Sequence, residues 1–276
     1  MKLLTAIPVY NEEHHLEGIL REVRRYSPDV LVVNDGSTDR TADLLAAFGR
    51  NLEGSAHPLR VITHPHNRGY GAALISAFAY ALEQEIDVLV SVDCDGQHEP
   101  SRIAVLLEAI HDADIVSASR YLRSFRQDGP APADRRQINQ QITAELNTRF
   151  GLHLTDAFCG FKAYRRGALA RLHVTEPGWG MPLQLWVQAA RLGLRIKEVG
   201  IPRVYLDPNR AFGGGLDDAE ERLAYYHRVI DAAAGDMAIG RRGDGAPEGK
   251  SCVAVSPCRR VTLSPLEPRS PRETCW

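Results

Sequence analysis

The chain lacks several features that mark common classes of protein. No apolar run in its 276 residues approaches the roughly 18 to 20 residues that a membrane-spanning helix needs. The formal net charge of −2 provides no basic footprint, which argues against a nucleic-acid partner. The amino-terminal segment reaches acidic and histidine residues by Glu12, so it lacks the apolar core of a signal peptide.

Cysteine is scarce, and its spacing is uninformative. The five cysteines form neither a disulfide framework nor a set with zinc-ligand spacing. Cys94 and Cys159 fall in the patterned part of the chain, whereas Cys252, Cys258 and Cys275 fall near its end. A reducing cytoplasm is therefore the expected compartment.

What the sequence does contain is a regular alternation of apolar runs and helical periodicity. Buried strands are predicted at residues 3–9, 30–33, 60–63, 88–92 and 115–118. A segment with apolar residues at helical spacing follows each of the first four. This pattern predicts an α/β fold, a single domain over residues 1–234 with a mostly parallel central sheet flanked by helices.

The second half of the chain is less regular. A mobile loop is predicted at residues 127–133, helices at 137–150, 182–192 and 217–233, and strands at 161–164, 196–199 and 203–206. From residue 235 the apolar periodicity ends and Gly, Pro, Arg and Ser alternate. Residues 235–276 are therefore predicted to form a disordered tail.

Unusual polar clusters follow four of the predicted strands. They are Tyr10-Asn11-Glu12, Asn34-Asp35-Gly36, the stretch from Asp93 to His98, and Ser119-Arg120-Tyr121. In sheets of this class, ligands bind beyond the carboxyl ends of the strands. The agreement among four strand ends predicts a binding site at that edge.

The strongest of these clusters contains two aspartates one residue apart. Strand alternation would direct Asp93 and Asp95 to the same side of the backbone. Two such carboxylates repel each other unless a cation lies between them, and Mg²⁺ or Mn²⁺ carrying a phosphorylated ligand is the simplest candidate. Gln97 is a plausible third oxygen ligand, and His98 is assigned to the loop. The alternative is that Asp95-Gly96 forms a turn and Asp93 a helix cap.

Other polar residues have weaker signals. A turn explains Gly36 and a helix cap explains Asp39, but neither explains Asp35, whose carboxylate suits hydrogen bonding to a base or ribose. The Asn67-x-Gly-x-Gly pattern is assigned to a close backbone approach at a helix start, and His64 to a loop. Four arginines lie in predicted loops or at element ends, where a guanidinium could bind phosphate: Arg120, Arg135, Arg136 and Arg210.

Taken together, the motifs resemble those of family 2 glycosyltransferases, and within that family the polyprenyl-phosphate sugar transferases. The matching stretches are Ile7 to Glu12, Val33 to Asp39, Asn67 to Gly71, Asp93 to Pro100, Ser119 to Tyr121 and Asp156 to Lys162. The resemblance covers roughly residues 3 to 230. It implies a GT-A fold that binds a nucleotide-sugar, either a GDP- or a UDP-sugar.

The resemblance also implies roles for individual residues. Pro8, Tyr10, Glu12 and Asp35 would hold the nucleoside, with a share for Asp93. Asp93, Asp95 and Gln97 would hold Mg²⁺ or Mn²⁺ and the diphosphate. Arg120, with Arg135 or Arg136 and Arg210, would meet the acceptor phosphate or the donor diphosphate. The reaction would be a single displacement that inverts the anomeric carbon.

Two departures from the family pattern bear on the acceptor. Gln184 stands where the family offers an acidic residue, so a general base for a sugar hydroxyl is missing. This favours a lipid-phosphate acceptor, reached from the bilayer surface, with the protein peripheral on the cytoplasmic membrane face. The second departure is the stretch from Arg210 to Leu216, which lacks the usual Ser and Lys and leaves acceptor and donor identity open.

Alternative functions predict different features. A nucleotidyltransferase needs a Gly-rich, cationic loop after the first strand, and Tyr10-Asn11-Glu12-Glu13-His14 is not one. A dehydrogenase needs Gly-x-Gly-x-x-Gly there, which is also missing. A non-catalytic nucleotide-sugar binder, or a transferase to a sugar hydroxyl or another small acceptor, remains compatible with Gln184 and the altered glycine loop.

Overall fold

Seven strands form one sheet at the centre of the molecule. The computed structural model describes residues 1–205 and 212–240, with backbone alone at 236–240. The strands are β1 Leu3–Val9, β2 Val30–Asn34, β3 Arg60–Thr63, β4 Val88–Ser91, β5 Ile115–Ser119, β6 Lys162–Arg165 and β7 Ile196–Gly200. Their order is β3-β2-β1-β4-β6-β5-β7, and β6 alone runs antiparallel to its neighbours β4 and β5. The predicted mostly parallel α/β sheet is confirmed.

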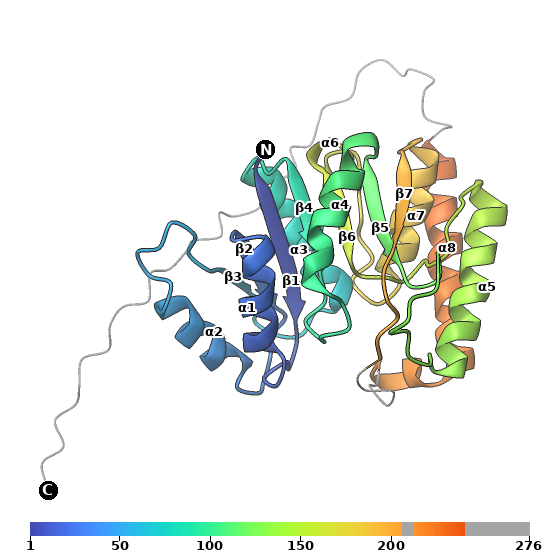
Figure 1. Ribbon diagram of the computed structural model, residues 1–276. Helices are drawn as coiled ribbons and strands as arrows, with labels where there is room; N and C mark the ends of the chain where they lie inside the picture. The colour runs from blue at the N-terminus through green and yellow to red at the C-terminus, as the bar shows by residue number, and fades with distance from the viewer. Residues whose placement is uncertain (206–211, 241–276) are drawn as a thin grey trace, which may run out of the picture.

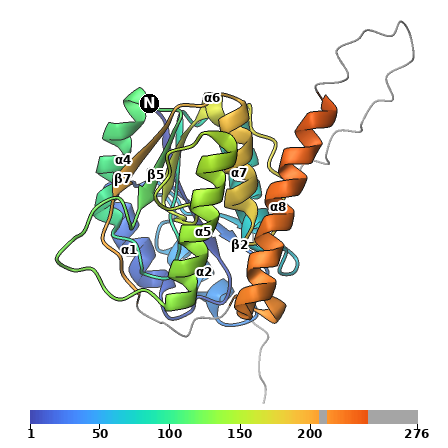
Figure 2. The ribbon, with the colours of Figure 1, turned by 90° about the vertical axis from the view of Figure 1, so that its right-hand side faces the viewer.

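Helices cover both faces of this sheet (Figure 2). One layer contains α1 Leu16–Tyr26, α2 Thr41–Arg50 and α4 Ile103–Ala109. The other contains α3 Tyr70–Glu83, α5 Ala133–Phe150, α7 Met181–Arg191 and α8 Ala219–Gly240. The short α6 Arg166–Leu169 follows β6, and single 3-10 turns lie at Pro100–Arg102, Ile110–Asp112 and Gly214–Asp217.

Alternation along the strands produces two cores, one on each face of the sheet. Leu31 and Val33 pack toward α3, α5, α7 and α8, whereas Val30 and Val32 pack toward α1 and α2. All four side chains are fully buried. A strand that is apolar on both faces is typical of a parallel sheet between two helical layers.

Two predicted element boundaries were wrong. Residues 203–205 do not form a strand; Arg203 instead bonds through its backbone to Asp128 and Gly129 of the β5–α5 loop, at 2.8 Å each. Leu206, the last residue of that predicted strand, lies outside the described residues. The last helix, predicted to end near Ala233, continues to Gly240, beyond its last core residues Val229, Ile230 and Ala233. The rest of the predicted tail, residues 241–276, lies outside the described residues.

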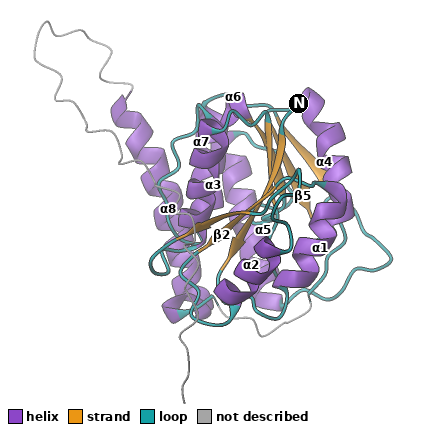
Figure 3. Ribbon diagram, turned by 90° about the vertical axis from the view of Figure 1, so that its left-hand side faces the viewer, coloured by secondary structure: helices purple, strands orange, loops and turns teal. Residues whose placement is uncertain are grey.

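The carboxyl ends of the parallel strands meet at one edge of the sheet, the lower edge in Figure 1. The polar stretches after β1, β2, β4 and β5 lie in loops there, together with the start of α5 (Figures 1 and 3). Within the described ranges, no helix is long and apolar enough to cross a membrane.

Candidate functional site

A cavity of about 790 Å³ opens at this edge of the sheet. Its lining includes nearly all of the predicted site residues: Pro8, Tyr10, Glu12, Asp35, Asp93, Asp95, Gln97, Arg120 and Arg135. Arg136 is not part of the lining, and Arg210 lies outside the described residues. Four separate loops therefore converge on one site, as the strand ends predict.

Asp93 is held by two neighbouring side chains. It accepts hydrogen bonds from the Tyr70 hydroxyl at 3.0 Å and from His98 Nε2 at 3.3 Å. Burial alone would raise the pKa of Asp93, but the hydrogen bonds from His98 and Tyr70 and the nearby Lys162 ammonium hold that pKa below its ordinary value. The side chain therefore stays anionic although it is mostly enclosed.

Asp95 lies in a turn directly after β4. Its Oδ1 accepts the backbone N–H of Gln97 at 3.0 Å, and Gly96 adopts a positive φ of 71°. Strand alternation was the wrong reason for bringing the two aspartates together, because β4 ends at Ser91. Both still line the cavity, since the turn directs Asp95 and Gln97 back toward it.

His98 is more than the loop residue that was predicted. Its side chain is 4% exposed, its ring lies 5.5 Å from that of Phe161, and it contacts Asp93. Within the described part of the chain, its Nδ1 has no hydrogen-bond partner. A signal for this role was present in the sequence, since His98 closes the Asp93-to-His98 stretch.

The donor set at Asp93 and Asp95 fits a hard divalent cation that a ligand helps to hold. No group of three or more His, Cys, Asp or Glu side chains is arranged to hold a metal alone in residues 1–205 and 212–240. Two carboxylates and an amide oxygen are typical of Mg²⁺ or Mn²⁺ sites that phosphate oxygens complete. Asp93, Asp95 and Gln97 fit that chemistry.

Asp35, directly after β2, is held by three hydrogen bonds. Its Oδ1 accepts His64 Nδ1 at 2.6 Å and the Arg68 N–H at 3.0 Å, while Oδ2 accepts the Gly69 N–H at 2.8 Å. His64 is itself buried and contacts the Ser76 hydroxyl through Nε2 at 2.8 Å. Sequence reasoning placed His64 correctly in a loop but missed this contact.

The loop after β1 forms the outer wall. Tyr10 is 43% exposed, whereas Glu12 is buried and contacts His15 Nδ1 at 2.9 Å. Asn11 has a positive φ of 54°, and its side-chain oxygen accepts the Thr38 N–H at 2.8 Å. Asparagine tolerates this left-handed conformation better than most residues, so the loop keeps a defined shape.

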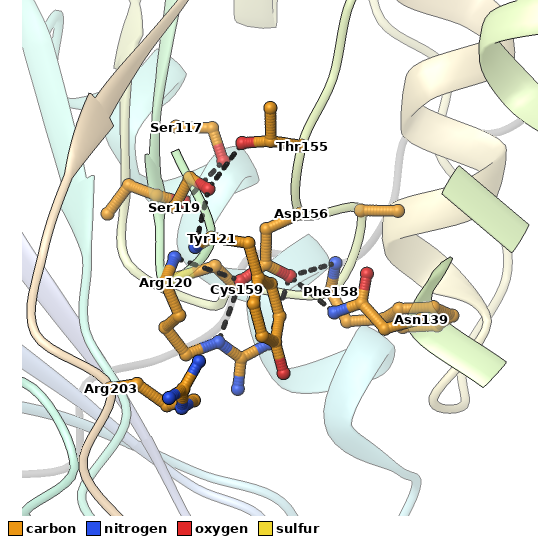
Figure 4. Close-up of polar contacts among 12 residues, drawn as sticks. Ser117, Ser119, Arg120, Tyr121, Asn139, Thr155, Asp156, Phe158, Cys159 and Arg203 are labelled. Atoms are coloured by element: carbon orange, nitrogen blue, oxygen red, sulfur yellow. Dashed lines mark hydrogen bonds and ion pairs between the residues drawn. The ribbon is translucent and has the colours of Figure 1, made fainter. Parts of the chain in front are cut away.

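Arg120 forms a buried ion pair with Asp156 (Figure 4). The guanidinium donates from Nε at 2.7 Å and from one terminal nitrogen at 2.9 Å, and Asn139 donates to the same carboxylate at 2.7 Å. Although burial opposes ionisation of both groups, Arg120 lowers the pKa of Asp156 to about 2, and Asp156 raises the pKa of Arg120. The pair fixes Arg120 at the cavity wall.

A second cationic group lies between α5 and α8; the sequence analysis named Arg135 of this group and missed Arg222. The guanidinium of Arg222 lies 4.5 Å from the ring centroid of Phe212, and that of Arg135 lies 4.8 Å from it. Arg222 also donates to Asp134 at 2.5 Å. The Trp179 indole donates to the Phe212 carbonyl at 3.1 Å, so all of these groups are connected.

Two further sequence assignments have clear outcomes. Gly69 and Gly71 begin α3 and pack against residues 176–178, where a β-carbon on either glycine would overlap backbone atoms. The close approach at a helix start is confirmed. Gln184 accepts the backbone N–H groups of Thr175 and Glu176 at 2.8 Å each and does not line the cavity.

Comparison with known proteins identifies the family of this chain. The model of the family described as Glycosyl transferase family 2 matches residues 5–172. This chain belongs to glycosyl transferase family 2. The family assignment made from the motifs is confirmed, and with it the expectation of a glycosyltransferase.

Two curated relatives extend the family assignment. The chain is 37% identical over 227 residues to the undecaprenyl-phosphate mannosyltransferase of Micrococcus luteus, covering 79% of this chain and 91% of that protein. It is 34% identical over 212 residues to the polyprenol monophosphomannose synthase of Mycolicibacterium smegmatis, covering 72% and 76%.

A solved structure supports the fold. Glucosyl-3-phosphoglycerate synthase from Mycobacterium tuberculosis, in complex with Mn²⁺ and UDP-glucose, superposes with a TM-score of 0.64 at 22% identity, covering 85% of this chain and 79% of that one. At this identity the likeness shows a shared GT-A fold.

Proposed function

We propose that this glycosyltransferase is a metal-dependent, inverting enzyme that transfers a sugar from a GDP- or UDP-sugar to a polyprenyl phosphate. The observation that carries the proposal is one cavity lined both by Asp93 and Asp95 and by a cationic wall, defined as Arg120, Arg135 and Arg222. A nucleotide-sugar and an anionic acceptor require two such regions. Within this proposal the enzyme works in the cytoplasm, peripheral to the membrane.

The nucleoside end of the donor is assigned to the loops after β1 and β2. Pro8, Tyr10, Glu12 and the Asp35 side chain all line the cavity. The three donors on Asp35 hold its carboxylate in one orientation, which suits a recognition site for a base or ribose. Such a pre-organised acceptor binds without a further ordering cost.

The diphosphate is assigned to Asp93, Asp95 and Gln97, which would hold Mg²⁺ or Mn²⁺. When bound, the cation stabilises the negative charge that develops on the leaving nucleoside diphosphate. Tyr70 and His98 keep Asp93 in place for this task. A metal-bound structural neighbour of the same fold, the Mn²⁺ complex of glucosyl-3-phosphoglycerate synthase, is in line with this assignment.

The acceptor phosphate is assigned to the cationic wall. Arg120 is held by Asp156, and Arg222 by Asp134, so both guanidinium groups are positioned in advance. The carboxylates that line the described cavity are engaged: Glu12 with His15, Asp35 with His64, Asp93 with Tyr70, and Asp95 with Gln97. An acceptor that is already anionic needs none of them as a base. The names of the two mannosyl relatives also support a lipid phosphate.

The reaction in this arrangement is a single displacement. An oxygen of the acceptor phosphate forms a bond to the anomeric carbon as the bond from that carbon to the diphosphate breaks. The electron pair of the broken bond leaves with the nucleoside diphosphate. Because the acceptor approaches from the side opposite the leaving group, the configuration at the anomeric carbon inverts.

Nucleoside diphosphate release tests this proposal. The purified full-length chain is incubated with Mn²⁺, polyprenyl phosphate and, in separate reactions, GDP-mannose, UDP-glucose or UDP-N-acetylglucosamine. The matched control replaces polyprenyl phosphate by the corresponding polyprenol, which lacks only the phosphate. We expect release with the phosphate and none with the alcohol. The proposal would be overturned if polyprenol supported release and polyprenyl phosphate did not, or if no donor gave any release.

A further inference from the structure

The β5–α5 loop, residues 120–132, extends from the body of the molecule beyond α1 and α4 (Figures 2 and 3). Arg120 stands at its beginning, and Arg135 lies in the first turn of the helix that follows it. Both arginines line the cavity. The loop is therefore part of the rim on the side to which the acceptor phosphate is assigned.

The outer part of this loop combines apolar and cationic side chains. Leu122 is 44% exposed and is the exposed apolar residue of this stretch. Arg123 and Arg126 are exposed, and neither forms an ion pair with another described residue. Phe125 is half-buried, and two guanidinium groups lie near its ring centroid, that of Arg123 at 4.7 Å and that of Arg102 at 5.5 Å.

The loop is braced rather than loosely attached. Asp128 accepts the Phe125 N–H at 2.9 Å and the Arg203 N–H at 2.8 Å, and Gly129 donates to the Arg203 carbonyl at 2.8 Å. The acidic side chain of Asp128 thus points inward, to backbone donors. Leu122, Arg123 and Arg126 remain on the outside.

We propose that this tip, defined as residues 122–126, is a docking surface for an anionic bilayer. The Leu122 side chain enters the interface between headgroups and acyl chains, and Arg123 and Arg126 bind the anionic headgroups. Docking there holds the cationic wall of the cavity against the membrane surface, where a lipid phosphate is presented. The inference rests on the proposed lipid-phosphate acceptor.

Vesicle co-sedimentation tests the docking surface directly. The full-length chain is mixed with phosphatidylcholine vesicles with and without phosphatidylglycerol. We expect binding only with the anionic lipid, and a partition coefficient roughly 30-fold lower for the Arg123→Gln/Arg126→Gln variant, from about 1 kcal/mol for each arginine. Leu122→Ser should weaken binding further.

The matched control removes the same charge at the opposite edge of the sheet. Arg166 and Arg171 are exposed residues in and just after α6, and Arg166→Gln/Arg171→Gln should bind vesicles as the wild type does. Equal melting temperatures establish that both double variants are folded. The inference would be overturned if both double variants lost vesicle binding equally, or if the wild type bound vesicles equally well with and without phosphatidylglycerol.

Turnover separates this inference from the proposed function. With a short-chain isoprenyl phosphate in solution, Arg123→Gln/Arg126→Gln should keep the wild-type rate. With a long-chain polyprenyl phosphate in anionic vesicles, its rate should fall with its binding. Equal rates for the variant and the wild type on vesicles would contradict docking by this loop. A wild-type chain that is inactive on both acceptors would contradict the proposed function instead, and the sedimentation result would then decide the docking.

Discussion

Replacing Gly160 by alanine should disable the carboxylate pair while preserving the fold. A β-carbon at this position would lie 2.2 Å from Asp93 Oδ2 and 2.5 Å from Oδ1. Carbon and oxygen atoms that are not bonded keep roughly 3.2 Å or more between them, so the carboxylate has to move by about 1 Å. Tyr70 and His98 hold that carboxylate, and the movement therefore breaks their hydrogen bonds as well.

The expected loss follows from that displacement. Misplacing a reacting group by about 1 Å can cost roughly 100-fold in rate. We expect a loss of about this size in kcat/KM for Gly160→Ala, measured as nucleoside diphosphate release. The rise in melting temperature caused by Mn²⁺ and a nucleotide-sugar, compared with the nucleotide-sugar alone, should disappear.

A second glycine provides the control. A β-carbon on Gly18, in the middle of α1, would meet no atom within 4 Å. Gly18→Ala should keep full activity and raise the free energy of unfolding by roughly 0.5 to 1 kcal/mol. If a folded Gly160→Ala variant kept wild-type turnover and metal-dependent binding, Asp93 could not have the position and role assigned to it.

Three other changes test further parts of the site. Asp156→Asn should cost about 3 kcal/mol of unfolding free energy, because it leaves Arg120 as a buried cation without its counter-ion. The pKa of Asp156 falls from 3.8 to about 2 on folding, so the wild type should lose about 2 kcal/mol of unfolding free energy as the pH drops through that interval. Chemical denaturation at several pH values should show that Asp156→Asn lacks this pH-dependent loss. His64→Ala should weaken nucleotide-sugar binding about tenfold in calorimetry, and His64→Asn, which can still donate to Asp35, should restore much of it; equal affinities for both would contradict the positioning role. Asp95→Asn keeps an oxygen for the turn but should remove the Mn²⁺-dependent thermal shift, and a persisting shift would assign the metal elsewhere.

The sequence predicted the parts of the fold and site that depend on local pattern. Continuous apolar runs identified the parallel strands, and the polar residues after them identified Asp35, Asp93, Asp95 and Arg120. The first half of the chain follows one repeating unit, so its strand ends had to meet at one edge.

The parts that sequence reasoning missed depend on contacts between distant segments. Arg120 meets Asp156 because β6 inserts antiparallel between β4 and β5, and no local pattern specifies that insertion. His64 meets Asp35 because β2 and β3 end side by side. Arg222 reaches the cavity through the packing of α8 against α5. Asp93 and Asp95 do line one cavity, but the alternation used to pair them ends at Ser91, and their role at a metal stays a prediction.

The anomeric configuration and linkage of the product test the central claim most directly. The sugar-lipid formed from the active nucleotide-sugar and polyprenyl phosphate can be isolated, and NMR can read both features from the anomeric proton and its coupling to phosphorus. The account predicts a sugar 1-phosphate linkage whose configuration is opposite to that of the donor, formed with Mn²⁺ or Mg²⁺ and not with a chelator. A retained configuration, or a sugar joined to a hydroxyl, would contradict it.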